Sequence, residues 1–248
     1  MEGGLLKEEP PMEGSLAEKK ILVAATTNKH KIEEISAIAG AFGYSVISRA
    51  EAGMPDVEIA EDGATFEENS LIKARAVFNW LGGKASSVAD DSGIEADALG
   101  GAPGVYSARF AGQEAPGVYA AGPDGDVADF SAAEAETGQM HRSLQDRANN
   151  AKLLRLLEGE PEERRTARFV SVITCLMPGR DPIVCRGEVE GHIAFSQTGE
   201  GGFGYDPLFI PLGYNKSFGL FTPEEKNAIS HRARALMLLA EKLKGVVI

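Results

Sequence analysis

Hydrophobic residues recur along this chain with the periods expected of buried strands and amphipathic helices. Residues 21–25 are uninterrupted Ile-Leu-Val-Ala-Ala and predict a buried strand. A helical period follows from about Lys29 to Phe42, with the apolar face formed by Ile32, Ile35, Ala39 and Phe42. Residues 44–47 then predict a second strand. The chain therefore begins with a strand, a helix and a strand.

Capping residues mark where later helices begin. Thr65 and Glu68 form a capping box, which predicts a helix to about Leu81, ended by two glycines. Thr222, with Pro223 at the first helical position, marks another start. A final amphipathic helix follows, with an inner face of Ala233, Leu236, Leu239, Ala240 and Leu243.

The remaining pattern completes a mixed sheet. Val88 and Ala89 end a strand that delivers Asp90 and Asp91 at its carboxyl edge. A helix is predicted from about 144 to 157. Residues 169–177 and 183–189 predict a hairpin whose first strand is nearly all apolar and therefore central. Alternating strands and helices with a hairpin among them predict the α/β class with a mixed sheet flanked by helices.

Two stretches lack such a pattern. Residues 1–18 are rich in Glu, Gly and Pro and predict a disordered acidic tail. Residues from about 115 to 143 are dominated by Ala, Gly, Asp and Glu, and predict a mobile surface insertion with one short helix near 131–136. Residues 19–248 are otherwise expected to form a single domain that carries this insertion.

Charge narrows the possible partners. The net charge of −12 argues against binding to nucleic acid or to an anionic membrane surface, which requires a basic face. We find neither an apolar run of about 18 residues nor a secretory signal, so we expect a cytoplasmic protein. A polyanionic substrate would need a locally basic, metal-assisted pocket.

The two cysteines, Cys175 and Cys185, lack metal-ligand spacing. They would lie opposite each other on the hairpin if its turn were centred on Arg180, and a disulfide would then be conceivable. Two buried thiols are the favoured interpretation in a cytosolic protein.

The first candidate site is the junction between the first strand and helix, Thr26 to Lys31. Free amides and the helix dipole at such a junction attract anions, and Lys31 lies within reach of a phosphate. Asn28 can bond either the turn or a ligand. A simple N-cap with two solvated lysines is the alternative.

The second candidate site is Asp90-Asp91-Ser92-Gly93. Adjacent aspartates on a strand point in different directions, so one can bind Mg²⁺ while the other orients or deprotonates water. A strand-ending turn is the alternative. Glu61 and Asp62 are the nearest additional carboxylates, although an exposed turn is their default placement.

Two further groups could serve the same pocket. Asn69 and Lys73 lie one helical turn apart and share a face, which could equally be a solvated one. The glycine-rich loop 201–207 contains Phe203 and Tyr205. Glycines let backbone approach a flat ring closely, so the loop suits stacking on a base, whereas a hairpin with core aromatics is the alternative.

A basic pair opens the last helix. Cations near a helix start oppose its dipole, so His231 and Arg232, with Lys226 one turn upstream of Ser230, suggest an anionic or hydrogen-bonding partner. Ordinary surface charge is the alternative. The other histidines show no ligand spacing, which makes a zinc site improbable: His30, His141 and His192.

Taken together, these motifs resemble the inosine triphosphate pyrophosphatase family. The resemblance runs from about Ile21 to Leu243, apart from the insertion. It rests on the Thr-x-Asn-x-x-Lys start at Thr26, the runs 89–94 and 99–109, the Gly-Gly-Phe-Gly-Tyr-Asp-Pro loop and Ser-His-Arg. This chain departs from the family in two places. It has Thr27 where family members often have glycine, and its insertion is longer than expected for the family.

The resemblance implies a homodimer of two-lobed α/β subunits with a strongly twisted mixed sheet. It implies Mg²⁺-dependent hydrolysis of ITP, dITP and XTP to the monophosphate and pyrophosphate. Asp91 would be the catalytic base and a metal ligand, with Glu61 a second metal ligand. The implied substrate-binding residues are Thr26, Thr27, Asn28, Lys29, His30, Lys31, Lys73, Ser92, Phe203, Gly204, Tyr205, Asp206, Lys226, His231 and Arg232.

The mechanism expected from these roles is in-line attack by a water that Asp91 activates, with Lys31 and Lys73 stabilising charge on the leaving pyrophosphate. Arg232 would donate to the base and Phe203 would stack on it. Two other functions stay open. One is a pyrophosphatase for modified pyrimidine or other nucleotides on a related fold. The other is a non-catalytic nucleotide-binding module, which the full set of carboxylates and cations disfavours.

Overall fold

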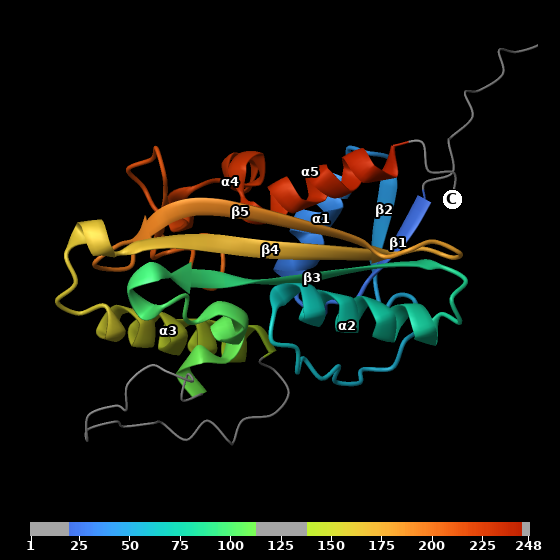
Figure 1. Cartoon of the computed structure of the whole chain (residues 1–248), viewed down its shortest axis with the longest axis horizontal. Coiled ribbons are helices and arrows are strands. Elements are labelled where there is room, and N and C mark those ends of the chain that lie inside the picture. The colour runs from blue at the N-terminus through green and yellow to red at the C-terminus, as the bar shows by residue number, and fades with distance from the viewer. Residues whose placement is uncertain (1–19, 113–137, 245–248) are drawn as a thin grey trace, which may run out of the picture.

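A six-stranded mixed sheet forms the centre of the protein in a computed structural model that describes residues 20–112 and 138–244 (Figure 1). The strand order is β2-β1-β3-β4-β5-β6. β1 pairs in parallel with β2 and β3, and the remaining pairs are antiparallel. The strands are β1 (Lys20–Ala24), β2 (Tyr44–Ser48), β3 (Ser86–Ala96), β4 (Thr166–Leu176), β5 (Ile183–Ile193) and β6 (Phe209–Pro211). The predicted mixed α/β class is confirmed, whereas the division into two lobes stays a prediction.

Helices cover both faces of this sheet. The helices are α1 (Lys29–Gly40), α2 (Phe66–Trp80), α3 (Gly138–Leu156), α4 (Pro223–Ile229) and α5 (His231–Leu243). Short 3₁₀ segments are η1 (Asp97–Leu99), η2 (Gly104–Gly112), η3 (Glu162–Arg164) and η4 (Phe218–Leu220). Figure 1 shows α2 and α5 on opposite sides of β4. One apolar cluster joins α1 and α5 to the sheet, and another joins α2 to its opposite face.

The predicted capping boxes are confirmed. Thr65 caps α2 together with Glu68, and Thr222 caps α4 together with Glu225. Asn28 caps α1 by accepting from the backbone amides of the next turn. All five residues predicted for the inner face of α5 are buried, namely Ala233, Leu236, Leu239, Ala240 and Leu243. These local signals therefore place four helices correctly.

Gly187 lets the start of α5 lie directly on β5. A Cβ atom at this position would collide with the His231 carbonyl oxygen and the Ala235 amide nitrogen. Because both obstacles are backbone atoms, a side chain here would push the helix away from the sheet. The glycine therefore brings the first residues of α5 against the centre of the molecule.

The two aspartates lie in the middle of a strand, which corrects the prediction that a strand ends just before them. β3 continues to Ala96, and Asp90 and Asp91 are opposite Ile173 and Val172 of β4. Antiparallel pairing with the long strand β4 satisfies the backbone of Asp-Ser-Gly, so no turn forms there. The alternative of a strand-ending turn is therefore wrong.

Two helix boundaries also differ from the predictions. α1 ends at Gly40, so Phe42 lies beyond it and is 41% exposed instead of belonging to its buried face. α3 begins at Gly138, so residues 138–143 belong to this helix and not to the insertion. The predicted acidic tail at 1–18 and the short helix near 131–136 lie outside the described residues.

The hairpin places its cysteines diagonally. Cys175 is opposite Ile183, and Cys185 is opposite Ile173, because the connecting turn is centred one residue earlier than Arg180. Both thiols are free and buried, as the favoured interpretation predicted. Burial raises the pKa of Cys175 to about 12.

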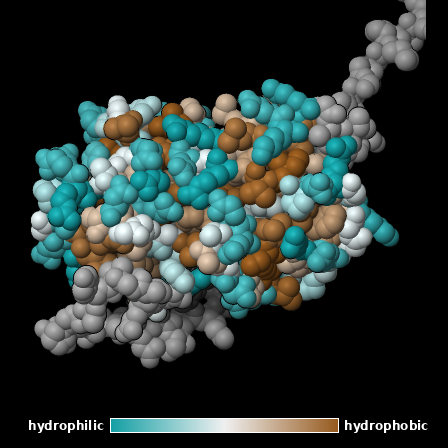
Figure 2. Space-filling model, viewed as in Figure 1, coloured by the Kyte–Doolittle hydropathy of each residue, from teal (hydrophilic) through white to brown (hydrophobic). Residues whose placement is uncertain are grey.

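The surface in Figure 2 is a mixture of polar and apolar residues on the face shown. Among residues 20–112 and 138–244, no helix is both long and apolar enough to cross a bilayer.

Candidate active site

Asp90 and Asp91 define a site at the middle of β3, because neighbouring strand residues point to opposite faces of the sheet. Asp90 faces α1 and α5, from which Lys31 and Arg232 reach it. Asp91 faces α2, from which Lys73 reaches it. The two buried carboxylates thus form ion pairs with cations from the helices on both faces of the sheet.

Asp90 is a fully paired carboxylate. Lys31 Nζ lies 2.6 Å from it, and Arg232 donates to both of its oxygens at 3.2 Å. The hydroxyls of Ser171 and Ser92 also donate to it, at 2.6 Å and 3.1 Å. Burial opposes the charge, but Arg232 and Lys31 hold the pKa of Asp90 well below its usual range. Asp90 therefore stays ionised and orients the two cations.

Asp91 has the opposite character. Its Oδ1 accepts from Lys73 Nζ at 2.5 Å, while its buried Oδ2 has no hydrogen-bond partner among the described residues. Burial raises the pKa of the Asp91 carboxyl, against the lowering effect of Lys73 and Lys31. A carboxylate with a raised pKa and an unpaired oxygen is suited to accept a proton or to ligate a metal.

Glu61 lies on the other side of Lys73. Lys73 Nζ is 3.2 Å from Glu61 Oε2, so one ammonium group bridges both carboxylates. Arg109 Nη2 donates to the Glu61 carbonyl at 3.3 Å, and Asn69 Oδ1 accepts from the Gly63 amide at 2.8 Å. These two contacts fix the loop that carries Glu61. Arg109 belongs to the run 99–109, but nothing in its local sequence assigns it this role.

A second cluster joins α1, α4 and α5. Lys226 Nζ lies 2.9 Å from Glu34 and 2.7 Å from Asp206, and Glu34 also pairs with Arg232. Burial would raise the pKa of Glu34, but Arg232 and Lys226 hold it at about 2. We did not predict a role for Glu34. Its position three residues after Lys31, on the same face of α1, is a signal that could have found it.

Phe203 lies among these charged groups. Its ring stacks on His30 with centroids 5.5 Å apart and planes 10° apart. Lys226 Nζ is 4.5 Å from the ring centroid, and the Arg232 guanidinium carbon is 5.6 Å from it. The ring is only partly buried. Phe203 therefore lies at the site, beside Lys226 and Arg232.

Tyr205 and His231, which precede Asp206 and Arg232 in the chain, are both buried. Tyr205 is 4% exposed, and its hydroxyl donates to the Ser107 carbonyl at 2.8 Å. His231 stacks on Phe169 with centroids 4.7 Å apart. Burial, together with Arg232 and Lys226, lowers the pKa of His231 well below its usual value. A lowered pKa favours the neutral imidazole, so we do not expect His231 to act as a cation, and its role in substrate binding stays a prediction.

The other predicted residues lie around these clusters. Thr26 Oγ1 accepts from the Asn28 amide at 3.1 Å, and Asn28 Oδ1 accepts from the amide of His30 at 3.1 Å. Thr27 and Lys29 are exposed at this turn. The Gly204 amide donates to Asp146 at 2.8 Å. Lys226 and Arg232 are almost fully buried, which excludes ordinary surface charge for both.

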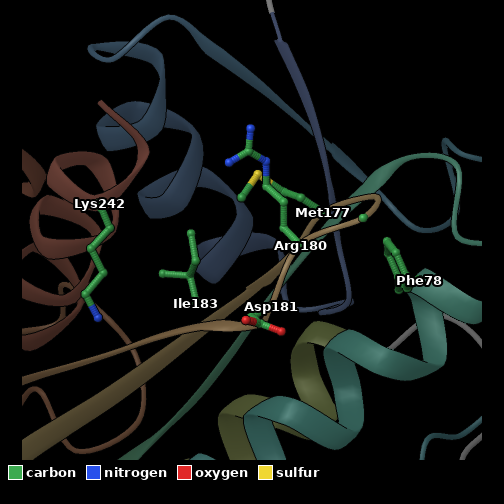
Figure 3. A pocket seen from close by; sticks show the side chains of 7 residues that line it. Phe78, Met177, Arg180, Asp181, Ile183 and Lys242 are labelled. Atoms are coloured by element: carbon green, nitrogen blue, oxygen red, sulfur yellow. The ribbon is translucent and has the colours of Figure 1, made fainter. Parts of the chain in front are cut away.

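Two cavities lie elsewhere. The first, about 590 Å³, is beside the β4–β5 turn and is lined by Phe78, Met177, Gly179, Arg180, Asp181, Ile183 and Lys242 (Figure 3). The second, about 620 Å³, lies between the start of α2 and residues 99–106. Neither is lined by Asp91, Lys31 or Phe203. The site is instead defined by the ion pairs that join its charged groups directly.

The donor set fits a magnesium ion. Within the described ranges, no group of three or more His, Cys, Asp or Glu side chains could hold a metal. Mg²⁺, however, is usually held by one or two carboxylates and completes its shell with water and substrate phosphates. Asp91 and Glu61 supply such a pair of carboxylates, with Lys73 Nζ between them.

The fold and site define an α/β protein whose paired carboxylates and buried cations suit a metal-bound phosphate ligand. The chain belongs to the Ham1 family, whose model matches residues 22–242. It is 39% identical over 232 residues to the dITP/XTP pyrophosphatase of Clostridium perfringens, with 92% of this chain and 99% of that protein covered. It is 43% identical over 228 residues to the dITP/XTP pyrophosphatase of Desulforamulus reducens, with 92% and 97% covered.

Solved structures agree with this assignment. The Ham1 protein of Staphylococcus aureus matches with a TM-score of 0.70 and 36% identity, covering 91% of this chain and 99% of that one. The nucleoside-triphosphatase and dITP/XTP pyrophosphatase of Mycobacterium abscessus matches with a TM-score of 0.61 and 38% identity, covering 88% and 98%. The resemblance inferred from the motifs is therefore confirmed.

Proposed function

We propose that this protein hydrolyses the non-standard purine triphosphates ITP, dITP and XTP to the monophosphate and pyrophosphate. The relatives named dITP/XTP pyrophosphatase support the substrate class. The observation that carries the chemistry is the buried Asp91 carboxylate, whose pKa is raised by burial and whose Oδ2 has no hydrogen-bond partner in the described part of the chain. The Lys73 ammonium pairs with this carboxylate and Lys31 pairs with the neighbouring Asp90, so both cations are available to meet phosphate charge.

In this mechanism Asp91 orients the attacking water and accepts its proton at Oδ2 as the water attacks the α-phosphorus. The leaving pyrophosphate gains negative charge, which the ammonium groups of Lys31 and Lys73 stabilise. Asp90 keeps Lys31 in place through its 2.6 Å ion pair. Asp91 and Glu61 would hold Mg²⁺, which supplies further neutralisation of the triphosphate when bound.

We place the base beside Phe203 and Arg232. The Arg232 guanidinium donates four hydrogen bonds, which go to Asp90, Glu34 and Ser92. A guanidinium has five N–H donors, so one donor is left for a ligand within the described part of the site. Donation to O6 of a 6-keto purine fits this free N–H, whereas the 6-amino group of adenine would leave it unpaired.

A panel of triphosphates tests this function. With Mg²⁺ present, we expect pyrophosphate release from dITP and XTP to exceed release from dATP by up to roughly 10⁴-fold in kcat/KM. Equal efficiency on dITP and dATP would show that the base pocket is misassigned. A clear preference for a modified pyrimidine nucleotide would favour the related-fold alternative. Tight binding without release from any triphosphate would favour a non-catalytic module.

We further propose a homodimer that works in the cytoplasm on free nucleotides. The family resemblance supports the dimer, and the acidic composition supports the lack of a nucleic-acid partner. Light scattering coupled to size-exclusion chromatography should give twice the mass of one chain. A monomeric mass at micromolar concentration would contradict the dimer.

A further inference from the structure

Lys73 occupies the space between the two proposed metal ligands. Its Nζ lies 2.5 Å from Asp91 Oδ1 and 3.2 Å from Glu61 Oε2, and its side chain is 9% exposed. Of the ion pairs formed by the described residues, those of Lys73 are the only ones that include either carboxylate. The ammonium group therefore offsets one of the two negative charges that a divalent ion would otherwise meet.

An ammonium group and a divalent ion cannot share this position. Asp91, whose side chain is 9% exposed, needs a counter-ion, because an uncompensated charge in a protein interior is strongly unfavourable. Glu61, whose side chain is 34% exposed, adds a second negative charge beside it. A divalent ion between Asp91 and Glu61 would repel an ammonium about 3 Å from either carboxylate, since like charges at such separations repel by several kcal/mol even at moderate dielectric. Binding of the metal therefore requires Lys73 to move.

We propose that Lys73 is an internal counter-ion that holds Asp91 and Glu61 in the metal-free protein and is displaced when the metal binds. This inference rests on the proposed metal site. The displaced ammonium, on a flexible four-carbon stem, becomes available to the substrate phosphates. Lys73 thus links the two binding events: it opposes metal binding in the absence of nucleotide and supports the metal–nucleotide complex.

The surroundings of Glu61 favour movement of Lys73 over movement of the ligands. Arg109 holds the Glu61 carbonyl at 3.3 Å, and Asn69 holds the Gly63 amide at 2.8 Å, both independently of Lys73. Asp91 is fixed in the ladder between β3 and β4. The two carboxylates therefore stay in place while the lysine side chain, which has the most rotatable bonds of the three, changes position.

Mn²⁺ binding without nucleotide tests the proposal. Isothermal titration at pH 8 would compare the wild type with Lys73→Met, Lys73→Arg and Glu61→Gln. We expect Lys73→Met to bind Mn²⁺ at least about tenfold more tightly, because the competing charge is gone. Lys73→Arg keeps the charge and should stay within about threefold of the wild type. Lys226→Met is the matched control, since it removes a buried cation that pairs with Glu34 and Asp206 instead.

The outcomes separate this inference from the metal site itself. Unchanged or weaker Mn²⁺ binding by Lys73→Met, with binding lost in Glu61→Gln, would overturn the counter-ion role and keep the metal site. Equal binding by the wild type, Glu61→Gln and Lys73→Met would overturn the metal site and this inference together. An equal gain in Lys226→Met would show a general charge effect and would also overturn the proposal.

A second measurement uses the wild-type protein and covers the case in which Lys73→Met does not fold. Labelling with an amine-reactive reagent, read by mass spectrometry, reports how accessible each lysine is. We expect saturating Mn²⁺ to speed the labelling of Lys73 and to leave the labelling of Lys226 unchanged. The same Lys73 rate with and without Mn²⁺ would overturn the displacement.

Discussion

Two neighbouring aspartates on β3 have different chemistry because of the atoms around them. Asp90 is bonded to Lys31, Arg232 and two hydroxyls, and its pKa is held well below the usual range. Within residues 20–112 and 138–244, Asp91 meets one ammonium group and has an oxygen without a hydrogen-bond partner, and burial raises its pKa. Pairs of carboxylates whose surroundings separate their pKa values typically divide structural and catalytic work between them.

We predict opposite results for the two substitutions. Asp91→Asn should lower kcat for dITP by about 10²-fold or more, because a general base is lost, while the melting temperature stays close to that of the wild type. Asp90→Asn should instead destabilise the fold by roughly 3–5 kcal/mol, since it leaves Lys31 and Arg232 without their buried counter-ion. Steady-state pyrophosphate release and urea unfolding would measure both effects. Near wild-type turnover by Asp91→Asn would exclude it as the base.

A further prediction concerns Glu34 and acid stability. Its pKa falls from 4.5 to about 2 on folding, so its ionised form stabilises the fold by about 3 kcal/mol at neutral pH. Because the folded pKa is the lower one, this contribution is complete above pH 4.5 and is lost as the pH falls toward 2. Glu34→Gln should therefore show a shallower loss of unfolding free energy between pH 5 and pH 2.

Urea unfolding at several pH values would test this dependence. Glu33→Gln is the control, because its side chain is 74% exposed and lies next to Glu34 on the same helix. It should keep the wild-type slope. A Glu34→Gln protein with the wild-type slope would contradict the assigned ion pairs.

At the scale of elements, β3 and η2 are packed so closely that no side chain fits between them. A Cβ atom at Gly93 would collide with the Ser107 hydroxyl and lie 2.5 Å from the Gly104 carbonyl oxygen. The same hydroxyl accepts from the Ile94 amide at 2.9 Å and donates to the Gly104 carbonyl at 2.6 Å. This contact fixes the part of β3 that begins two residues after Asp91.

We predict that Gly93→Ala costs about 1–3 kcal/mol of stability, because backbone atoms cannot give way as a flexible side chain would. The displaced strand should also lower kcat for dITP. Gly40→Ala at the end of α1 is the matched control: a Cβ there meets nothing within 4 Å, so stability should stay unchanged or rise slightly. Chemical denaturation would compare them. Equal stability of the two variants would refute the close packing.

At the scale of the whole molecule, the site is assembled from both faces of the sheet. α2 brings Lys73 from one side, and α1 and α5 bring Lys31 and Arg232 from the other, all to one segment of β3.

η2 and α3, which flank the predicted insertion, are joined by the Asn149 side chain. Its amide accepts from the Ala111 amide at 2.8 Å and donates to the Ser107 carbonyl at 3.2 Å.

We predict that residues 115–137 are dispensable for catalysis. Their composition offers few large apolar residues to offset the roughly 1–2 kcal/mol per residue that backbone ordering costs. Replacing them with a short Gly-Ser linker should leave kcat for dITP within about threefold, since the flanking elements keep their own contacts. Turnover and the mass of the assembly should both be measured. Loss of either would show that the insertion contributes to the site or to the dimer.

The sequence by itself determined the features that depend on neighbouring residues. Caps such as Thr65, the buried face of α5 and the central position of β4 follow from short-range periodicity and hydrogen bonding. The motifs also named most of the charged groups of the site, because residue types at fixed spacing carry the chemistry of the family.

Only the tertiary structure decided which charged groups meet. Glu34 and Arg232 are 198 residues apart, and Arg232 and Asp90 are 142 apart, so no local pattern shows that they pair. Likewise, β3 was expected to end just before Asp90, but its pairing with β4 continues to Ala96. Burial also differs among residues that the motifs had grouped, because Phe203 is partly exposed whereas Tyr205 and His231 are buried. Pairing and burial depend on contacts between distant segments, and these exist only once the sheet and its two helical layers have formed.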